Sequence, residues 1–137
     1  MAAVWWFLSA ADAAEGIRRA LSVGNTEAAD RFLTEAASRI LLAPAGAEVP
    51  PGAITEAPTT GDVQYDTLLA TALAFALSQH GTEAPDWMLS RPALPREWLW
   101  DGGYDAEGPF KEFIRARTPD MFLAKNLLLR ERDLVAP

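Results

Sequence analysis

The chain has 137 residues, half of them hydrophobic, which is enough for one hydrophobic core and predicts a single domain covering residues 1–137. Its 19 acidic and 12 basic residues give a net charge of −7, which disfavours a polyanion such as nucleic acid as its partner. The sequence contains no cysteine, so disulfides, thiolate zinc sites and cysteine nucleophiles are excluded, and a reducing cytoplasm is the expected location.

Residues 3–42 are predicted to form two antiparallel helices. The first helix is expected over residues 3–23, because its apolar residues recur at helical spacing: Trp6, Ala10, Ala13, Ile17 and Leu21. Gly24 can end this helix in the left-handed conformation, and Asn25 or Thr26 can cap the second helix. The short apolar run at residues 2–8 lacks the basic residues of a signal peptide, and no apolar stretch approaches the roughly 18 residues of a membrane span. We therefore expect neither a secretion signal nor a membrane partner.

Residues 43–61 are predicted to form a long, poorly ordered loop. From residue 44 to residue 60 there are four prolines, two glycines and three threonines, with little apolar periodicity. The loop separates the helix pair 3–42 from the main helical part 62–137 without dividing the chain into two domains.

The main helical part begins with TGDVQYDTLLATALAFALSQHG, which predicts a helix capped by Thr60 or Asp62 and ended by Gly81. Its middle is apolar on nearly all sides, as expected of a central helix buried among its neighbours. His80, the chain's one histidine, lies in the last turn, where we expect it to interact with the helix dipole and to have no catalytic role.

Beyond Gly81, prolines at positions 85, 92, 95, 109 and 119 break the pattern into short pieces. Pro109 and Pro119 suit the first positions of two short helices, and Asn126 can leave the second in the left-handed conformation. Residues 127–129 are then expected to be extended and to lead into a terminal turn. The sequence thus predicts an all-α, irregular bundle of about five or six helices with a long proline-rich loop.

The stretch PDWMLSRPALPREWLW, residues 85–100, holds three of the five tryptophans. Large aromatic residues between prolines most simply pack an irregular segment onto a helical core, with each indole N–H hydrogen-bonded at the rim. The alternative is a surface that binds a partner protein, because tryptophan and arginine are enriched where proteins bind each other. The candidate partner-binding residues on that interpretation are Trp87, Arg91, Arg96, Trp98 and Trp100.

No pattern in the sequence indicates catalysis, a cofactor or a metal site. Acidic residues do accompany aromatic ones in one segment, as a glycosidase-like site would require: Glu97, Asp101, Asp105 and Glu107 beside Trp98, Trp100 and Tyr104. Nothing in the spacing brings two of these carboxylates face to face, so a solvated loop explains them. A small hydrolase acting through Glu97 and Asp101 is the last of the functions considered, and we expect a non-enzymatic protein with no cofactor.

The C-terminal part is richer in basic residues than the rest of the chain, with six against four acidic ones from Lys111 onward. These six residues are Lys111, Arg115, Arg117, Lys125, Arg130 and Arg132. They leave open an alternative function, a nucleic-acid-binding transcriptional regulator, although no helix-turn-helix pattern precedes them.

The order of segments resembles the helical domain of bacterial, especially actinobacterial, antitoxin-like proteins. In that family a TGD…(W/Y)D.LLA helix precedes P.W and PW segments and a closing SP..F…L segment. The matching positions here are Thr60, Asp62, Tyr65, Asp66, Leu69, Pro85, Trp87, Trp98, Thr118, Pro119, Phe122, Asp133 and Leu134. The chain departs from the pattern at Asn126, where glycine is preferred, and at residues 127–129, and it carries no DNA-binding module.

The resemblance implies a toxin–antitoxin system in which the chain binds and neutralises a partner protein, such as a nucleotidyltransferase-like toxin. An excess of acidic residues would then meet the basic nucleotide-binding groove of that partner. The leading expectation is a cytoplasmic antitoxin-like or adaptor protein, and whether it also forms a homodimer stays open.

Overall fold

The computed structural model describes residues 5–100 and 108–135 of the chain. Within them it is all-α, with six α-helices, two 3-10 turns and two strands of two residues, which confirms the predicted fold class. The helices are α1 (Ala10–Ser22), α2 (Thr26–Leu41), α3 (Val63–Gln79), α4 (Asp86–Leu89), α5 (Pro109–Arg115) and α6 (Asp120–Leu123). The strands are β1 (Trp98–Leu99) and β2 (Leu127–Leu128), and the 3-10 turns are η1 (Pro51–Ala53) and η2 (Glu131–Leu134).

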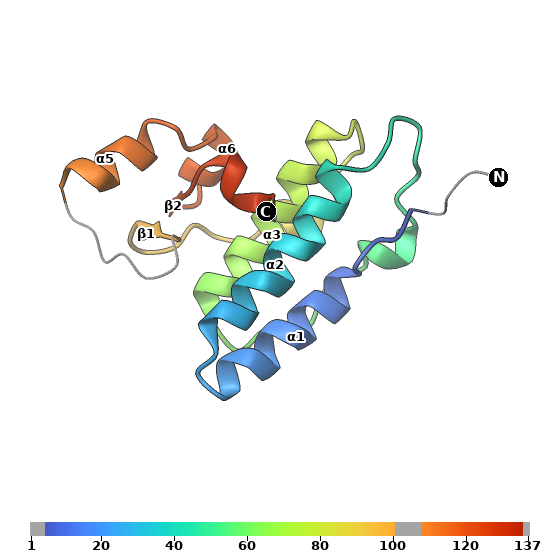
Figure 1. Cartoon of the computed structure of the whole chain (residues 1–137), viewed down its shortest axis with the longest axis horizontal. Helices are drawn as coiled ribbons and strands as arrows, with labels where there is room; N and C mark the ends of the chain where they lie inside the picture. Colours follow the sequence, from blue (N-terminus) through green and yellow to red (C-terminus); the bar gives the residue numbers. More distant parts are fainter. Residues whose placement is uncertain (1–4, 101–107, 136–137) are drawn as a thin grey trace.

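Helix α3 is the centre of the fold, as predicted. Its residues from Thr67 to Leu77 are all buried, and it contacts α1, α2, α4 and α6. Figure 1 shows α1, α2 and α3 alongside one another, with α5, α6 and both strands gathered on the left of the view. Asp62 caps α3 by accepting a hydrogen bond from the backbone N–H of Tyr65, and Gly81 follows the helix with φ +78°, as the sequence indicated.

The first helix starts later than predicted. It begins at Ala10 and not at residue 3, because Ser9 is extended and its hydroxyl accepts a hydrogen bond from the N–H of Asp12. Residues 5–9 lie outside any helix, and Trp6 is 52% exposed although the helical stripe predicted that it would be buried. Trp5 instead donates a 2.6 Å hydrogen bond from Nε1 to the carbonyl of Arg39 on α2.

The proline-rich loop is also different from the prediction. It was expected to be poorly ordered, but Val49, Ile54 and Ala57 pack against the core and Pro51–Ala53 forms a 3-10 turn. His80 Nε2 lies 2.7 Å from the carbonyl of Ala47, so the histidine at the end of α3 fixes the loop. Because the apolar residues of the loop are isolated and show no periodicity, the sequence did not predict that they would pack. In the structure they pack against the core.

The C-terminal part follows the prediction in most respects. Pro109 is at the start of α5, and Asn126 has φ +62°, in the left-handed region. Pro119 is the capping residue before α6, whereas it was predicted at the first helical position. Strands β1 and β2 are parallel, with Trp98 opposite Leu127 and Leu99 opposite Leu128. Among the described residues, none of the helices is both long and apolar enough to cross a membrane.

Candidate partner-binding hollow

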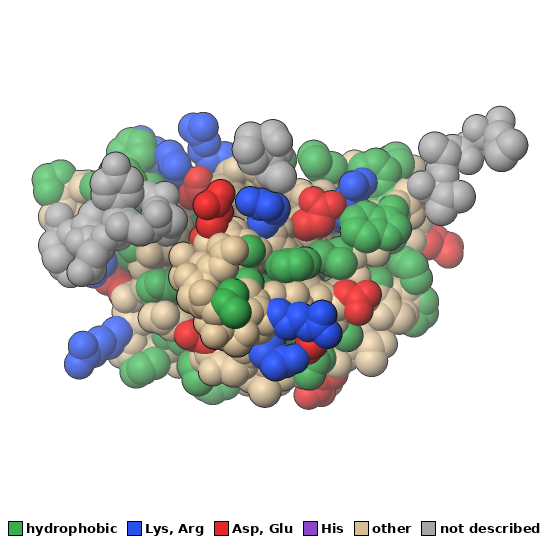
Figure 2. All heavy atoms as spheres, turned by 60° about the horizontal axis from the view of Figure 1, so that its bottom comes forward, with side chains coloured by type: hydrophobic (Ala, Val, Ile, Leu, Met, Phe, Trp, Pro, Cys, Tyr) green, Lys and Arg blue, Asp and Glu red, His purple; other side chains and the backbone are tan. Residues whose placement is uncertain are grey.

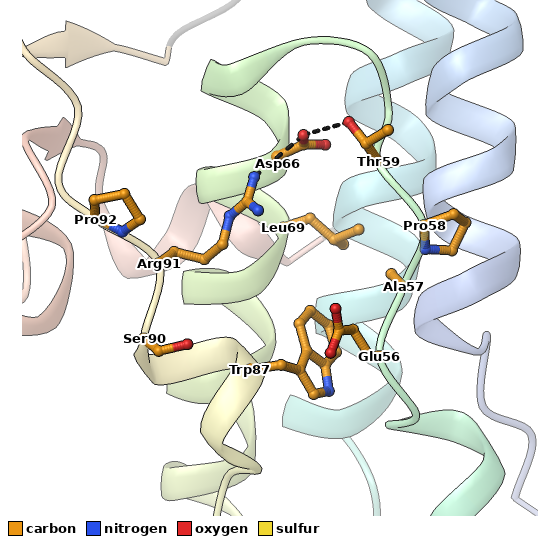
Figure 3. A pocket seen from close by; sticks show the side chains of 10 residues that line it. All are labelled: Glu56, Ala57, Pro58, Thr59, Asp66, Leu69, Trp87, Ser90, Arg91 and Pro92. Carbon is orange, nitrogen blue, oxygen red and sulfur yellow. Dashed lines mark hydrogen bonds and ion pairs between the residues drawn. The ribbon is translucent and has the colours of Figure 1, made fainter.

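A hollow of about 690 Å³ lies between the end of the proline-rich loop, α3 and the segment that includes α4. We call it the α3–α4 hollow, and Figure 3 shows its side chains. It is lined by Glu56, Ala57, Pro58, Thr59, Asp66, Leu69, Trp87, Ser90, Arg91 and Pro92. Residues 56–59 at the end of the loop, residues 66–69 of α3 and residues 87–92 therefore meet at one surface site.

The carboxylate of Asp66 holds one end of this hollow together. Its Oδ1 accepts hydrogen bonds from the backbone N–H and the hydroxyl of Thr60, at 2.7 and 2.6 Å. Its Oδ2 accepts a 2.6 Å hydrogen bond from the Thr59 hydroxyl and lies 3.1 Å from Nη2 of Arg91. One side chain on α3 thus joins the loop to the segment after α4.

The same contacts decide the charge of Asp66. Burial alone would raise the pKa of its carboxyl, but the hydrogen bonds from Thr59 and Thr60 and the nearby charge of Arg91 together lower that pKa below its usual value. Asp66 is therefore ionised at neutral pH, and its charge balances that of Arg91.

The local sequence explains why Asp66 is in this position. Gly61 adopts φ +86°, which lets the chain turn sharply between Thr60 and the capping residue Asp62. The hydroxyl of Thr60 accepts a 3.2 Å hydrogen bond from the N–H of Asp62. Asp66 is one helical turn beyond Asp62 and so faces back toward the two threonines.

The other end of the hollow is aromatic and acidic. Trp87 lies on the short helix α4 and is half-buried, and its Nε1 donates a 2.9 Å hydrogen bond to the carbonyl of Ile54. Glu56 is exposed, and no ion pair joins it to any residue that the structure describes. In Figure 3 the guanidinium of Arg91 points toward Asp66, whereas Glu56 and Trp87 lie at the opposite end.

The five predicted partner-binding residues do not form one surface. Trp87 and Arg91 line the hollow, and Arg96 is exposed in the turn before β1. Trp98 is half-buried, with its ring edge-on to the ring of Tyr65 at 5.4 Å between centroids. Trp100 is only 6% exposed, so this conformation keeps its ring from a partner.

Sequence reasoning missed the other half of the hollow. Glu56 and Pro58 are in the loop that was expected to be poorly ordered, and neither Asp66 nor Leu69 was predicted to be a binding residue. A usable signal was present: Thr59, Thr60 and Asp66 flank a helix start, where short polar side chains commonly bond the backbone.

The residues that carry the family resemblance bond within the chain. The hydroxyl of Thr118 donates to the carbonyl of Ile114 at 2.8 Å and accepts from the N–H of Leu129 at 3.2 Å. Phe122 is fully buried against Phe75, and Asp133 accepts hydrogen bonds from the backbone and guanidinium of Arg130. Like Asp62, Tyr65 and Asp66, these residues make structural contacts within the chain.

Most of the C-terminal basic side chains also bond within the chain. Lys111 and Arg115 pair with Glu97, and Arg130 pairs with Asp133. The guanidinium of Arg117 lies 3.6 Å from the ring centre of Phe113, and Lys125 donates to the carbonyls of Leu89 and Arg91. Arg132 is exposed. This arrangement gives no support to a continuous basic surface for nucleic acid.

Of the carboxylates weighed as a hydrolase site, the structure describes only Glu97, which pairs with Lys111 and Arg115. The hydrogen bond from Arg115 is the main reason that the pKa of Glu97 is lowered, whereas a general acid needs a raised pKa. Asp101, Tyr104, Asp105 and Glu107 lie outside the described residues. Within residues 5–100 and 108–135, no group of histidine, aspartate and glutamate side chains is placed to hold a metal ion.

A more open groove of about 570 Å³ lies between α1 and α2, where Phe32 covers Gly16. Figure 2 shows acidic and basic side chains interspersed on the face that includes α1. Glu15 in this groove pairs with Arg18 and Arg19, whose hydrogen bonds lower its pKa to about 2. The α3–α4 hollow is the better candidate, because Trp87 and Arg91, two of the predicted partner-binding residues, line it and none of the five lines this groove.

The chain matched no protein-family model, no curated protein and no solved structure.

Proposed function

We propose that this chain is a non-enzymatic, cytoplasmic protein of the antitoxin-like or adaptor type, which binds a partner protein through the α3–α4 hollow and holds it inactive. The observation that carries the proposal is that Trp87 and Arg91 line the same surface hollow. Each side chain is held in place by a contact to another segment, Trp87 to Ile54 and Arg91 to Asp66. Tryptophan and arginine are enriched among the few residues that dominate binding energy in protein interfaces, and pre-ordering their side chains lowers the entropic cost of binding.

The surroundings of the hollow support this function. Leu89, on the same short helix as Trp87, is 49% exposed, and Pro58 and Pro92 add apolar surface inside the hollow. A central aromatic and apolar patch with charged groups around it is the usual anatomy of a protein interface. The resemblance to antitoxin-like proteins adds the class of partner, a nucleotidyltransferase-like toxin, and the net charge of −7 is complementary to a basic nucleotide-binding groove.

The test is co-expression with the product of the gene adjacent to its own. We expect a stable complex and relief of any growth defect that the neighbouring product causes. Leu89→Ser should weaken the complex, and Trp87→Leu should weaken it by about 30-fold or more in Kd, the effect typical of a hot-spot residue.

Val23→Ser is the matched control, because Val23 is 78% exposed at the end of α1. Circular dichroism on all three variants checks that the fold is retained. The proposal fails if the two proteins do not associate, or if Leu89→Ser and Trp87→Leu bind as tightly as Val23→Ser.

A further inference from the structure

The charges in the α3–α4 hollow leave one acidic group without a counter-ion. Asp66 and Arg91 form an ion pair at 3.1 Å, and the two threonines complete the hydrogen bonding of that carboxylate. Glu56 is the third charged residue of the lining and has no ion pair with any other described residue. The hollow as a whole is therefore negative, and its open charge is at the Trp87 end.

The groups near Glu56 suit a cation on an apolar stem. The indole of Trp87 offers the aromatic face that attracts a guanidinium or ammonium group, since the ring quadrupole is negative above its plane. Pro58 and Pro92, which are exposed, supply apolar surface along which a methylene chain can lie. A planar guanidinium combines stacking on an indole with a hydrogen-bonded pair to a carboxylate, which a lysine ammonium does not.

We propose that the α3–α4 hollow binds an arginine side chain of the partner protein, with its guanidinium between Glu56 and the indole of Trp87. The inference deepens the proposed function, because it names the group that the partner inserts. The chain's net charge of −7 favours approach of a basic surface from a distance, and the hollow then gives one basic side chain a defined site.

The contacts of Arg91, the basic residue of the lining, disfavour binding of an anion in the same hollow. Nη2 of Arg91 already bonds Asp66, and Nε of Arg91 is buried, out of reach of a ligand, with no acceptor among the described residues. An anion would also face the carboxylates of Glu56 and Asp66. Arginine therefore fits the hollow better than an acidic side chain or a phosphate.

The test needs no partner, because a single blocked amino acid can serve as the probe. The indole Nε1–H resonance of Trp87, assigned by its loss in Trp87→Phe, is followed in the full-length protein during titration with N-acetyl-arginine N-methylamide. We expect a saturable shift that weakens with added salt. N-acetyl-citrulline N-methylamide has nearly the same shape without the charge and should bind up to about fivefold more weakly, as expected for the loss of an exposed ion pair.

Glu56→Gln should remove that preference for arginine over citrulline, while Glu83→Gln, an exposed acidic residue outside the lining, should keep it. The inference is overturned if the arginine probe gives no saturable shift, if citrulline binds equally well, or if Glu56→Gln retains the preference.

The two proposals fail in different ways. If the arginine probe binds as described while Trp87→Leu leaves the complex with the neighbouring gene's product intact, the hollow binds arginine and the proposed function is wrong. If the complex depends on Trp87 while arginine and citrulline bind equally, the proposed function stands and the arginine assignment is wrong.

Discussion

Trp100 donates a 2.7 Å hydrogen bond from its indole Nε1 to Oδ1 of Asp30, although 70 positions separate the two residues. The same oxygen accepts a second 2.7 Å hydrogen bond from the hydroxyl of Tyr65. Burial and the carboxylate of Asp30 both raise the pKa of Tyr65, so its phenol keeps the proton that it donates. One carboxylate on α2 thereby joins α2, α3 and the segment after β1.

Replacing this carboxylate should destabilise the protein. Asp30→Ala leaves the indole N–H of Trp100 and the hydroxyl of Tyr65 without their shared acceptor, which should cost about 2–3 kcal/mol in the free energy of unfolding. Asp30→Asn keeps a carbonyl oxygen at this position and should cost less. Urea unfolding followed by circular dichroism measures both.

Glu27→Ala is the control on the same helix, because Glu27 makes an exposed pair with Arg31 at 3.5 Å and lies in the first turn of α2, where it interacts with the helix dipole. It should cost under about 1 kcal/mol. A loss for Asp30→Ala no larger than that of Glu27→Ala would show that the shared acceptor contributes nothing to stability.

Gly16 on α1 is covered by the ring of Phe32 on α2, and a Cβ added at Gly16 would lie 2.6 Å from that ring. Alanine normally favours a helix over glycine by about 1 kcal/mol. We nevertheless expect Gly16→Ala to destabilise the protein, because the ring of Phe32 must move away and its packing against α1 at Gly16 is lost.

The same substitution in a Phe32→Ala protein tests whether the ring of Phe32 is the cause. In Phe32→Ala the ring is absent, so Gly16→Ala should there stabilise by about 0.5–1 kcal/mol through helix propensity alone. Thermal unfolding of the four proteins of this double-mutant cycle gives the sign of each step. An equal effect of Gly16→Ala in both backgrounds would contradict the packing argument.

The main elements of the fold were predictable from sequence because each had a periodic face and a local stop signal. Helix α3 had both, with Asp62 as its cap and Gly81 after its end. Helix α1 had the periodicity at Trp6 as well, yet the helix starts at Ala10, because the cap at Ser9 outweighs a pattern that extends beyond it. Local hydrogen bonding, and not hydrophobic spacing, sets the boundary.

The hollow was only half predictable for a different reason. Trp87 and Arg91 were named because their residue types are common at interfaces, and that argument needs no coordinates. Glu56 and Asp66 become part of the same site only when the loop folds back onto α3. Tertiary contacts, such as the hydrogen bond from Thr60 to Asp66, hold the loop in that position. Trp100 is buried with its indole N–H hydrogen-bonded, as the core-packing interpretation expected, but its acceptor Asp30 is on a distant helix and could not be identified from composition.

Asp66 should make stability depend on pH in the acidic range. The pKa of Asp66 in the folded protein lies below its ordinary value of 3.8, so the ionised carboxylate stabilises the folded state fully above that value. This contribution decreases as pH falls through 3.8 and is lost below the folded-state pKa. Asp66→Asn should therefore lose stability at pH 7 and differ progressively less from the wild type as pH approaches 3.

The measurement is a series of urea unfolding curves between about pH 7 and pH 3. Thr60→Val removes one hydroxyl donor to the carboxylate, so it should also reduce the pH dependence of stability, but by less than Asp66→Asn does. A constant stability difference between Asp66→Asn and the wild type across this range would show that the ionised carboxylate of Asp66 does not stabilise the folded state.

Asn126 controls how the chain enters β2, and substitutions there should rank in a defined order. Its φ of +62° costs a residue such as alanine about 1 kcal/mol. Its Nδ2 also donates a 2.6 Å hydrogen bond to the carbonyl of Leu94, worth about 1 kcal/mol more. Asn126→Ala loses both contributions and should destabilise by about 2 kcal/mol, whereas Asn126→Gly loses only the hydrogen bond.

The same position sets the pairing of the two strands, because the backbone carbonyl of Asn126 accepts a 2.8 Å hydrogen bond from the N–H of Trp98. The amide of Trp98 should accordingly exchange with deuterium fastest in Asn126→Ala, more slowly in Asn126→Gly and slowest in the wild type. If alanine is tolerated as well as glycine in both unfolding and exchange, the left-handed conformation is not what holds β2 in register with β1.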